Sequence, residues 1–509
     1  MASYRGIVVD IPAGEGSLNL DDSLMRVPMS DLLEAEGIVY EGRVWRKEPG
    51  AVKFDAAGIT GAPIIVATFD WWPNSTTQRL VTAALDGKLY KEVGGDLDSI
   101  TLASGLSTTK RGRFVAAGLE GAGKTRKLFY LNGLDSPRVL SADGVTASQI
   151  ATPATDWSGT NQPINALVHR TRLWALGNDN APHNLYGSGP DNHEDFACAT
   201  AVVQPVYPGV GEKLYAGVSF KGLLFAFKHP RGVFWLDDSP VNITSWAVNQ
   251  LTDALGIAAS PYSVLNLDED VLFLTETGHF HLLSVTTQGG VRAADSLSDQ
   301  LGISKWMRDN LNLARLDQAR SVWFGQKKLA LFALPRTGAT TNTARLMFDF
   351  SDVVRGGRPK FSYSFRDVSE ALALRKDADK IERPVFGDNA GVVWSLDQAS
   401  RSKAGAGYLG QYRIPDIDFS QVNSSIGAVK KNFDYLQITQ NPQAAGNGTV
   451  EVLIDGVLYR TLTFDLRERV ARQHIGGQGY SFGLRFKNSV NAEDFSVTKQ
   501  TVFMRQAGL

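Results

Sequence analysis

Short apolar runs recur at a nearly constant spacing over residues 56–400, and this repeat restricts the fold more than any other feature of the sequence. Most of the runs are rich in Val, Leu and aromatic residues and are bounded by Gly, Asp, Asn or Pro, which is typical of strands separated by turns. The first strand of each group is expected near residues 64, 114, 167, 215, 264 and 321. Successive positions are about 50 residues apart, the spacing of β-propeller blades with about four strands each.

A small sheet cannot bury both of its faces alone, and closing a ring of sheets removes exposed edges. We therefore predict an all-β fold with a six- or seven-bladed β-propeller over residues 56–400, with a large β-sandwich as the alternative. Glycine usage fits turns between blades, because 50 of the 509 residues are glycine, above the usual value of about 7%. Asp86-Gly87 and Asn132-Gly133 are two of the expected turns.

The two ends of the chain differ from the repeat. Beyond a Gly/Ser/Ala-rich stretch at 399–410, alternating strands and the tight turn Asp455-Gly456 predict a separate β-sandwich-like domain over residues 411–509. Residues 1–55 are expected to form an N-terminal extension with the first strands and a short helix over Ser30–Glu36, where Ser30 is the capping residue. A second short helix is expected over Ile303–Leu313.

Charge and cysteine content exclude several classes of protein. The chain has 52 Lys+Arg and 53 Asp+Glu, a formal net charge of −1, which argues against a protein that coats nucleic acid. Its one cysteine, Cys198, allows neither an intrachain disulfide nor a CxxC metal site. No apolar stretch is long enough to span a bilayer, and residues 1–6 lack the apolar core of a signal peptide. We expect folding in a reducing cytoplasm.

One segment matches a nucleotide-binding motif at every fixed position. Gly118 to Thr125 reads GxxxxGKT, in which backbone amides and the lysine would hold phosphates at a helix N-terminus. The chemistry needs a helix that begins at Lys124-Thr125, but the β-rich run 126–131 follows and soon reaches a turn. We interpret the segment as a glycine-rich hairpin loop, and a P-loop NTPase remains the less favoured alternative.

Other candidate sites are weaker. His279 and His281 are two residues apart on an expected strand and could share a face toward a metal, but no third ligand can be assigned. A polar loop could hold a cation, although solvated loop chemistry explains it as well; its members are His183, Asp191, His193, Glu194 and Asp195. The strand-associated tryptophans are interpreted as blade core; they are Trp71, Trp72, Trp174, Trp235 and Trp394. No pair of carboxylates stands out as catalytic. We therefore predict a protein that is not an enzyme, with no catalytic, cofactor-binding or metal-binding residues.

Several motifs occur in an order that resembles one known family. They are Leu18-Asn19-Leu20-Asp21-Asp22, Gly42-Arg43-Val44-Trp45-Arg46-Lys47-Glu48-Pro49-Gly50, Leu128-Phe129-Tyr130-Leu131-Asn132-Gly133, His169-Arg170-Thr171-Arg172-Leu173-Trp174 and Phe386-Gly387-Asp388-Asn389-Ala390-Gly391. In this order they resemble the tail nozzle and head–tail stabilisation proteins of short-tailed bacteriophages. The resemblance is spread over most of residues 15 to 400.

The resemblance implies a structural virion protein that assembles as a homohexamer in the phage tail and forms a channel for retaining and ejecting the packaged genome. It implies portal or adaptor proteins and tail fibres or spikes as partners, and double-stranded DNA that passes through without sequence-specific binding. A neutral or acidic lumen suits such a conduit, because basic contacts with DNA would be strong and salt-dependent. The implied location is the virion tail, after folding in the host cytoplasm. The alternative is a propeller-type tail protein that binds or degrades host polysaccharide.

Overall fold

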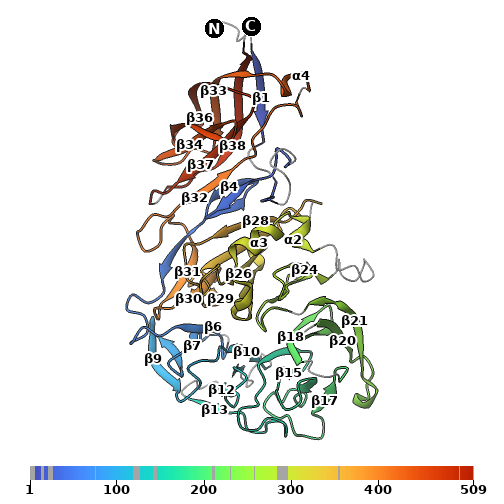
Figure 1. Ribbon diagram of the computed structural model, residues 1–509. Coiled ribbons are helices and arrows are strands. Elements are labelled where there is room, and N and C mark those ends of the chain that lie inside the picture. The colour runs from blue at the N-terminus through green and yellow to red at the C-terminus, as the bar shows by residue number, and fades with distance from the viewer. Residues whose placement is uncertain are drawn as a thin grey trace.

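The computed structural model of the chain describes residues 6–12, 16–20, 27–74, 76–118, 126–140, 146–208, 213–229, 231–256, 258–283, 296–353, 356–422, 424–491 and 493–507. The fold is all-β and consists of many small antiparallel sheets. Figure 1 shows a group of sheets from the middle of the chain at one end and a second group, formed by both ends of the chain, at the other.

Seven antiparallel units follow one another from β6 to β31, and in each unit neighbouring strands pair in chain order. The first three units are β6 (Ile65–Trp71), β7 (Arg79–Ala84), β8 (Lys88–Val93) and β9 (Asp96–Ala103); β10 (Arg113–Ala117), β11 (Lys127–Leu131), β12 (Arg138–Leu140) and β13 (Ala147–Gln149); and β14 (Asn165–His169), β15 (Arg172–Leu176), β16 (Asn184–Gly187) and β17 (Val202–Pro205). The next two are β18 (Lys213–Phe220), β19 (Leu223–His229), β20 (Arg231–Asp237) and β21 (Ala247–Gly256); and β22 (Val264–Asn266), β23 (Val271–Leu274) and β24 (Phe280–Leu282). The last two are β25 (Arg320–Phe324), β26 (Leu329–Leu334), β27 (Ala344–Asp349) and β28 (Lys360–Ser364); and β29 (Ala371–Lys376), β30 (Glu382–Gly387), β31 (Val393–Gln398) and β5 (Gly50–Lys53).

The first strands of the units contact one another in sequence order. The series runs from β6 through β10, β14, β18, β22 and β25 to β29, and β29 in turn contacts β6. Six of these strands begin close to the positions expected from the repeat, and the seventh, β29, begins at Ala371 and was not predicted. The last unit contains a strand from the other end of the sequence, since β5 pairs with β31.

Apolar clusters lie between neighbouring units. One cluster joins the units that begin with β6 and β10, and it contains Val66, Trp71, Phe114 and Tyr130. Separate clusters of the same kind join the following units. Each unit therefore buries its faces against its neighbours, as the repeat requires.

Beyond the seven units, the N-terminal and C-terminal segments form one body. Its strands are β1 (Ile7–Ile11), β2 (Glu34–Glu36), β3 (Ile38–Glu41), β4 (Val44–Lys47), β32 (Gly410–Arg413), β33 (Lys431–Gln440), β34 (Asn447–Ile454), β35 (Val457–Asp465), β36 (Val470–Gly479), β37 (Phe482–Asn488) and β38 (Val497–Gln506). A four-stranded sheet has the order β1-β38-β33-β36, so the first described strand pairs with the last. The sequence boundaries at residues 55 and 411 are thus crossed by strand pairing.

A nine-stranded sheet connects the two groups. Its order is β25-β26-β27-β28-β2-β32-β37-β34-β35, with β2 between the sixth unit and the C-terminal strands. β2 pairs parallel with β28 and antiparallel with β32. The strand β2 therefore links the two parts of the molecule through backbone hydrogen bonds.

The helix predicted over Ser30–Glu36 is wrong, because residues 34–36 form the strand β2. Long-range partners hold this backbone extended: the Leu32 amide donates to the Ser17 carbonyl at 2.9 Å and the Leu33 amide donates to the Arg413 carbonyl at 2.8 Å. Tertiary pairing here overrides the local helix signal. The helix predicted over Ile303–Leu313 is confirmed in its central part as α3 (Ser304–Asn310).

The other helical segments are short. They are α2 (Leu297–Gln300), α4 (Ser424–Gly427), η1 (Ile243–Ser245), η2 (Leu313–Gln318) and η3 (Gly325–Lys327). Within the ranges given above, none of the helices is long and apolar enough to cross a membrane.

Candidate functional site

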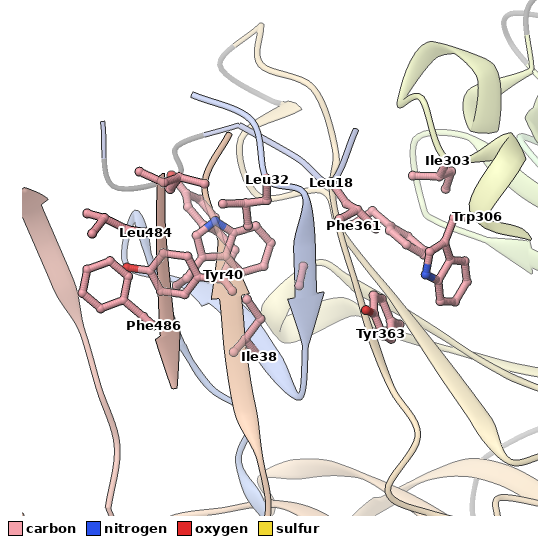
Figure 2. Packing of buried hydrophobic residues seen from close by; sticks show 14 of the residues in the cluster. Leu18, Leu32, Ile38, Tyr40, Ile303, Trp306, Phe361, Tyr363, Leu484 and Phe486 are labelled. Atoms are coloured by element: carbon pink, nitrogen blue, oxygen red, sulfur yellow. The ribbon is translucent and has the colours of Figure 1, made fainter. Parts of the chain in front are cut away.

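The junction between the two groups of sheets has an apolar side. Figure 2 shows side chains from β3, β28, α3 and β37 packed in one cluster, including Tyr40, Trp306, Phe361, Tyr363 and Phe486. The Trp306 ring centroid lies 4.6 Å from that of Tyr363 and 5.5 Å from that of Phe361. The cluster continues from the sixth unit into the C-terminal sheets without a break. Both parts therefore share one apolar core.

The junction also has a charged side, which is buried. Arg345 on β27 contacts Glu48 at 2.5 Å and Asp367 at 2.9 Å through its Nη2 atom. Arg366 and Lys403 contact Asp367 at 2.8 and 2.9 Å. Arg345, Glu48 and Asp367 are each at most 5% exposed at the side chain. We call these five residues the junction network; it ties the N-terminal segment to the sixth unit and to the stretch after β31.

The pKa of Asp367 reflects two opposing effects in this network, burial and nearby positive charge. Burial alone would raise the pKa of this carboxyl, but the nearby Arg345, Arg366 and Lys403 outweigh burial and hold the pKa below its usual range. For Lys47, beside the network, burial outweighs the nearby carboxylates and lowers the pKa of the side chain to about 8. Its Nζ donates to Asn488 Oδ1 at 3.1 Å and to the Val490 carbonyl at 2.6 Å. Lys47 thereby anchors β4 to the C-terminal strands.

Backbone segments approach each other closely at the junction. A Cβ atom added at Gly50 would lie 2.4 Å from both the Ser400 and the Ser402 carbonyl oxygens. Gly37 has φ +60°, and an added Cβ there would lie 2.2 Å from the Leu409 carbonyl oxygen. Both positions therefore require glycine. The motif at residues 42–50 therefore ends in glycine because the backbone at Ser400 and Ser402 leaves no room for a side chain at Gly50.

A small apolar cavity of about 200 Å³ lies beside the junction and is lined by Tyr40, Glu48, Pro49, Met347 and Asp349 among others. Asp349 is buried, and its carboxylate accepts a hydrogen bond from the Ser351 amide at 2.8 Å. Burial raises the pKa of Asp349 to about 6. The group therefore titrates near neutral pH.

A second cavity, of about 400 Å³, lies among the first strands of the units. Its lining comes in runs of consecutive residues, namely 66–70 of β6, 112–114 at the start of β10, 320–323 of β25 and 371–374 of β29. Since successive side chains of a strand point to opposite faces, consecutive residues line a cavity where the edge of the strand faces it. We call this space the central cavity.

Three arginines surround Tyr262 at the central cavity. The Tyr262 hydroxyl donates to the Arg111 carbonyl at 2.9 Å, and the Arg320 guanidinium carbon lies 3.7 Å from the centroid of the tyrosine ring. Arg111, Arg113 and Arg320 all act electrostatically on the phenol, although burial dominates and raises its pKa. Tyr262 also lines a further cavity of about 460 Å³ at the starts of the first strands. Tyr262 therefore lies between the central cavity and this further cavity.

The three arginines around Tyr262 differ in the groups that pair with their positive charge. Arg111 forms an ion pair with the buried Glu370 at 2.5 Å. Arg113 donates to Asn165 Oδ1 at 3.1 Å. Arg320 is 5% exposed and donates from Nη1 to the Gly112 carbonyl at 3.1 Å. Burial lowers the pKa of Arg320 to about 10. The sequence analysis did not identify this cluster, because its members come from separate repeats and match no motif.

The GxxxxGKT segment lies largely outside the described residues, which end at Gly118 and resume at Arg126. The strands on either side pair with each other antiparallel, and Ala117 is opposite Lys127. A strand therefore begins two residues after Thr125, where the motif's chemistry requires a helix.

The two histidines occupy different surroundings. His281 is buried, and its ring stacks on Phe273 with centroids 5.6 Å apart. Burial lowers the pKa of His281 to about 4. His279 Nδ1 lies 3.8 Å from Asp299. Over the described part of the chain, no group of three His, Cys, Asp or Glu side chains is arranged to hold a metal ion.

The polar loop after β16 is internally bonded. Asp195 accepts hydrogen bonds from the Ala197 and Cys198 amides at 3.1 and 2.9 Å, and Glu194 pairs with Lys127. His193 is buried, and burial lowers its pKa. The carboxylates of Glu194 and Asp195 thus have structural partners. The predicted core role of the strand tryptophans holds for Trp71, Trp174 and Trp394, which are buried; Trp72 and Trp235 are partly exposed.

No protein-family model and no curated protein matches this chain. Among solved structures it is similar to the extracellular domain of a putative hybrid two-component system from B. thetaiotaomicron, with 9% identity and a TM-score of 0.45 over 89% of this chain and 57% of that one. It is also similar to Raptor from Chaetomium thermophilum, with 8% identity and a TM-score of 0.41 over 71% of this chain and 29% of that one. The chain spans less than two thirds of the length of either structure.

Proposed function

We propose that this chain is a structural subunit of a short-tailed bacteriophage tail, related in role to tail nozzle and head–tail stabilisation proteins. In this proposal the seven units close into a seven-bladed propeller. The contact between β29 and β6 supports closure, and so does the pairing of β5 with β31 in the last unit. Such a ring leaves few sheet edges exposed.

The position of one motif carries the proposal. Residues 42–50 resemble the opening of nozzle proteins, and their side chains are structural: Trp45, Lys47 and Glu48 are buried in the junction. Gly50 lies against the backbone of the stretch after β31. A motif that joins two parts of a molecule suits a protein in which those parts must not move relative to each other. A tail subunit that transmits force between the head and the host has that requirement.

An exposed apolar strand edge offers a contact for a neighbouring copy. β35 is the last strand of the nine-stranded sheet, and Val457, Leu458 and Tyr459 are 68%, 53% and 49% exposed. Apolar residues on an edge strand favour association with another chain. We infer that this edge contacts the adjacent subunit in the assembled ring.

Electron microscopy of the purified chain mixed with a portal–adaptor complex tests the proposal. We expect a ring of six copies bound to the adaptor. The variant Leu458→Lys should stop ring formation without changing the melting temperature of the subunit, whereas Val241→Lys, at an exposed valine outside this edge, should assemble normally. A chain that stays monomeric and does not bind the complex, or that instead binds host polysaccharide in a glycan array, contradicts the proposal.

A further inference from the structure

We propose that the small apolar cavity beside the junction binds a small primary amine with an apolar body, whose ammonium group is held by the Asp349 carboxylate. We call this space the junction cavity; its volume is about 200 Å³. The inference is independent of a role in a virion, because it depends only on the residues that line this cavity.

The strand geometry directs the Asp349 side chain toward the junction cavity. Asp349 is the last residue of β27 and follows Met347 by two positions, so both side chains lie on the same face of the sheet. On the neighbouring strand β26, Leu329 is opposite Asp349 and Leu331 is opposite Met347. All four residues line the cavity. One face of the sixth unit therefore forms an apolar wall that ends in a carboxylate.

The Asp349 carboxylate is buried without a cation. The residue is 7% exposed, and its Oδ1 atom accepts a hydrogen bond from the Ser351 amide at 2.8 Å. Among the described residues its Oδ2 atom has no hydrogen-bond donor and is not fully enclosed, and the carboxylate forms no ion pair. Lys360, opposite Asp349 on β28, has its Nζ atom 3.9 Å from Asp352. Since a buried charge is normally paired, a cationic ligand would complete this site.

The other carboxylates that line the junction cavity have cations of their own. Glu41 pairs with Lys327, which also lines the cavity, at 3.1 Å. Glu48 pairs with Arg345 in the junction network. These pairs leave Asp349 as the lining carboxylate that a ligand's ammonium group can neutralise.

The rest of the junction cavity limits the size and character of the ligand. An apolar cavity of roughly 150 Å³ is known to hold benzene, so the space here admits one ring with a short substituent. Apolar side chains from β3, the sixth unit and the seventh unit complete the wall; they are Val39, Tyr40, Phe324, Pro384 and Leu396. A single ring that carries an aminomethyl group fits this lining.

Isothermal titration calorimetry with benzylamine at about pH 8 tests the inference, and benzyl alcohol is the uncharged compound of similar shape. At this pH the Asp349 carboxyl, with a pKa of about 6, is ionised, and an alkylammonium group is protonated. We expect benzylamine to bind at one site per chain and at least tenfold more tightly than benzyl alcohol. Asp349→Asn should abolish this preference. The control Asp379→Asn changes an exposed carboxylate elsewhere and should bind as the wild type does.

Three results would overturn the inference. They are the absence of saturable benzylamine binding below about 10 mM, equal affinities for the amine and the alcohol, or unchanged benzylamine affinity in Asp349→Asn. If Asp349→Asn does not fold, a structure of the wild-type chain with bound benzylamine decides the matter. The amine nitrogen should then lie within hydrogen-bond distance of Asp349 Oδ2, and density outside the junction cavity contradicts the site.

Discussion

Two buried arginines lie in one row of the sixth unit and have different surroundings. Arg320 on β25 is opposite Ala333 on β26, and Ala333 is opposite Arg345 on β27. Arg345 contacts two buried carboxylates, whereas Arg320 contacts an aromatic ring and a carbonyl. The two arginines are buried to a similar extent, and they differ in whether a carboxylate pairs with the positive charge. The arginine paired with carboxylates belongs to a joint within the molecule, whereas the other is held by the Tyr262 ring and the Gly112 carbonyl.

Loss of Arg345 should have the largest effect on stability. Arg345→Met leaves Glu48 without its closest buried partner and removes one of three cations from Asp367, so we expect the free energy of unfolding to fall by about 3–5 kcal/mol. Urea denaturation followed by tryptophan fluorescence measures the change. Arg505→Met, which removes a 56% exposed arginine from its ion pair with Asp434, is the control and should remain close to the wild type. A small effect of Arg345→Met would remove the distinction between the two arginines.

The close backbone approach at the junction gives a second prediction. Gly50→Ala places a methyl group where two carbonyl oxygens lie, and we expect destabilisation of roughly 1–3 kcal/mol. The control is Gly325→Ala, whose added Cβ would have no neighbour closer than 3.2 Å. Thermal melting of both variants measures the difference. Equal melting temperatures would show that the backbone at the junction shifts to admit the methyl group at little cost in stability.

Asp349 gives a pH-dependent prediction on the junction side of the sixth unit. Its folded pKa, about 6, is raised above the ordinary value of 3.8, so the folded state binds the proton more tightly. The stability from this group is fully present below about pH 4 and is lost as the pH rises through about 6. We expect Asp349→Asn to be more stable than wild type by about 2 kcal/mol at pH 8. The difference should vanish below pH 4, and a constant difference over that range contradicts the burial of the carboxyl.

Loss of Arg320 should have the smallest effect on stability. Because Arg320 forms no ion pair with a carboxylate among the described residues, its loss leaves no buried carboxylate unpaired, and Arg320→Met should change the free energy of unfolding by less than about 1 kcal/mol. The same denaturation experiment measures it. A loss as large as that expected for Arg345→Met would mean that Arg320 is itself a structural residue.

Much of the fold could be predicted because the repeat is encoded locally. Apolar runs bounded by turn residues predicted the first six leading strands, and Asp455-Gly456 forms the tight turn between β34 and β35, with φ of +53° and +77°. The missed strands lack that signal. β29 is mostly partly exposed and ends in Arg375 and Lys376. β36 contains Gly477 and Gly479, where an added Cβ would lie 2.3 and 2.1 Å from Ile454; these glycines permit close packing although they resemble a loop in the sequence.

The junction and the central cavity could not be predicted, because both depend on contacts between distant residues. Glu48 and Arg345 are 297 positions apart, and Arg320 and Gly112 are 208 apart. The strand β2 has a helix-like sequence, but it lies extended between β28 and β32 and pairs with both. The motif at residues 42–50 was recognised, but its role in joining two groups of sheets is visible only in three dimensions.

Hydrogen–deuterium exchange tests most directly the central claim that the N-terminal segment joins the two groups of sheets into one rigid subunit. We predict that peptides covering β2 and β32 exchange as slowly as those covering β27 and β34. In Arg345→Met, exchange should accelerate in all four strands together. Exchange of β2 and β32 in the wild type that is orders of magnitude faster than that of β27 and β34 would contradict the claim, because the two groups would then be joined by a loose connection.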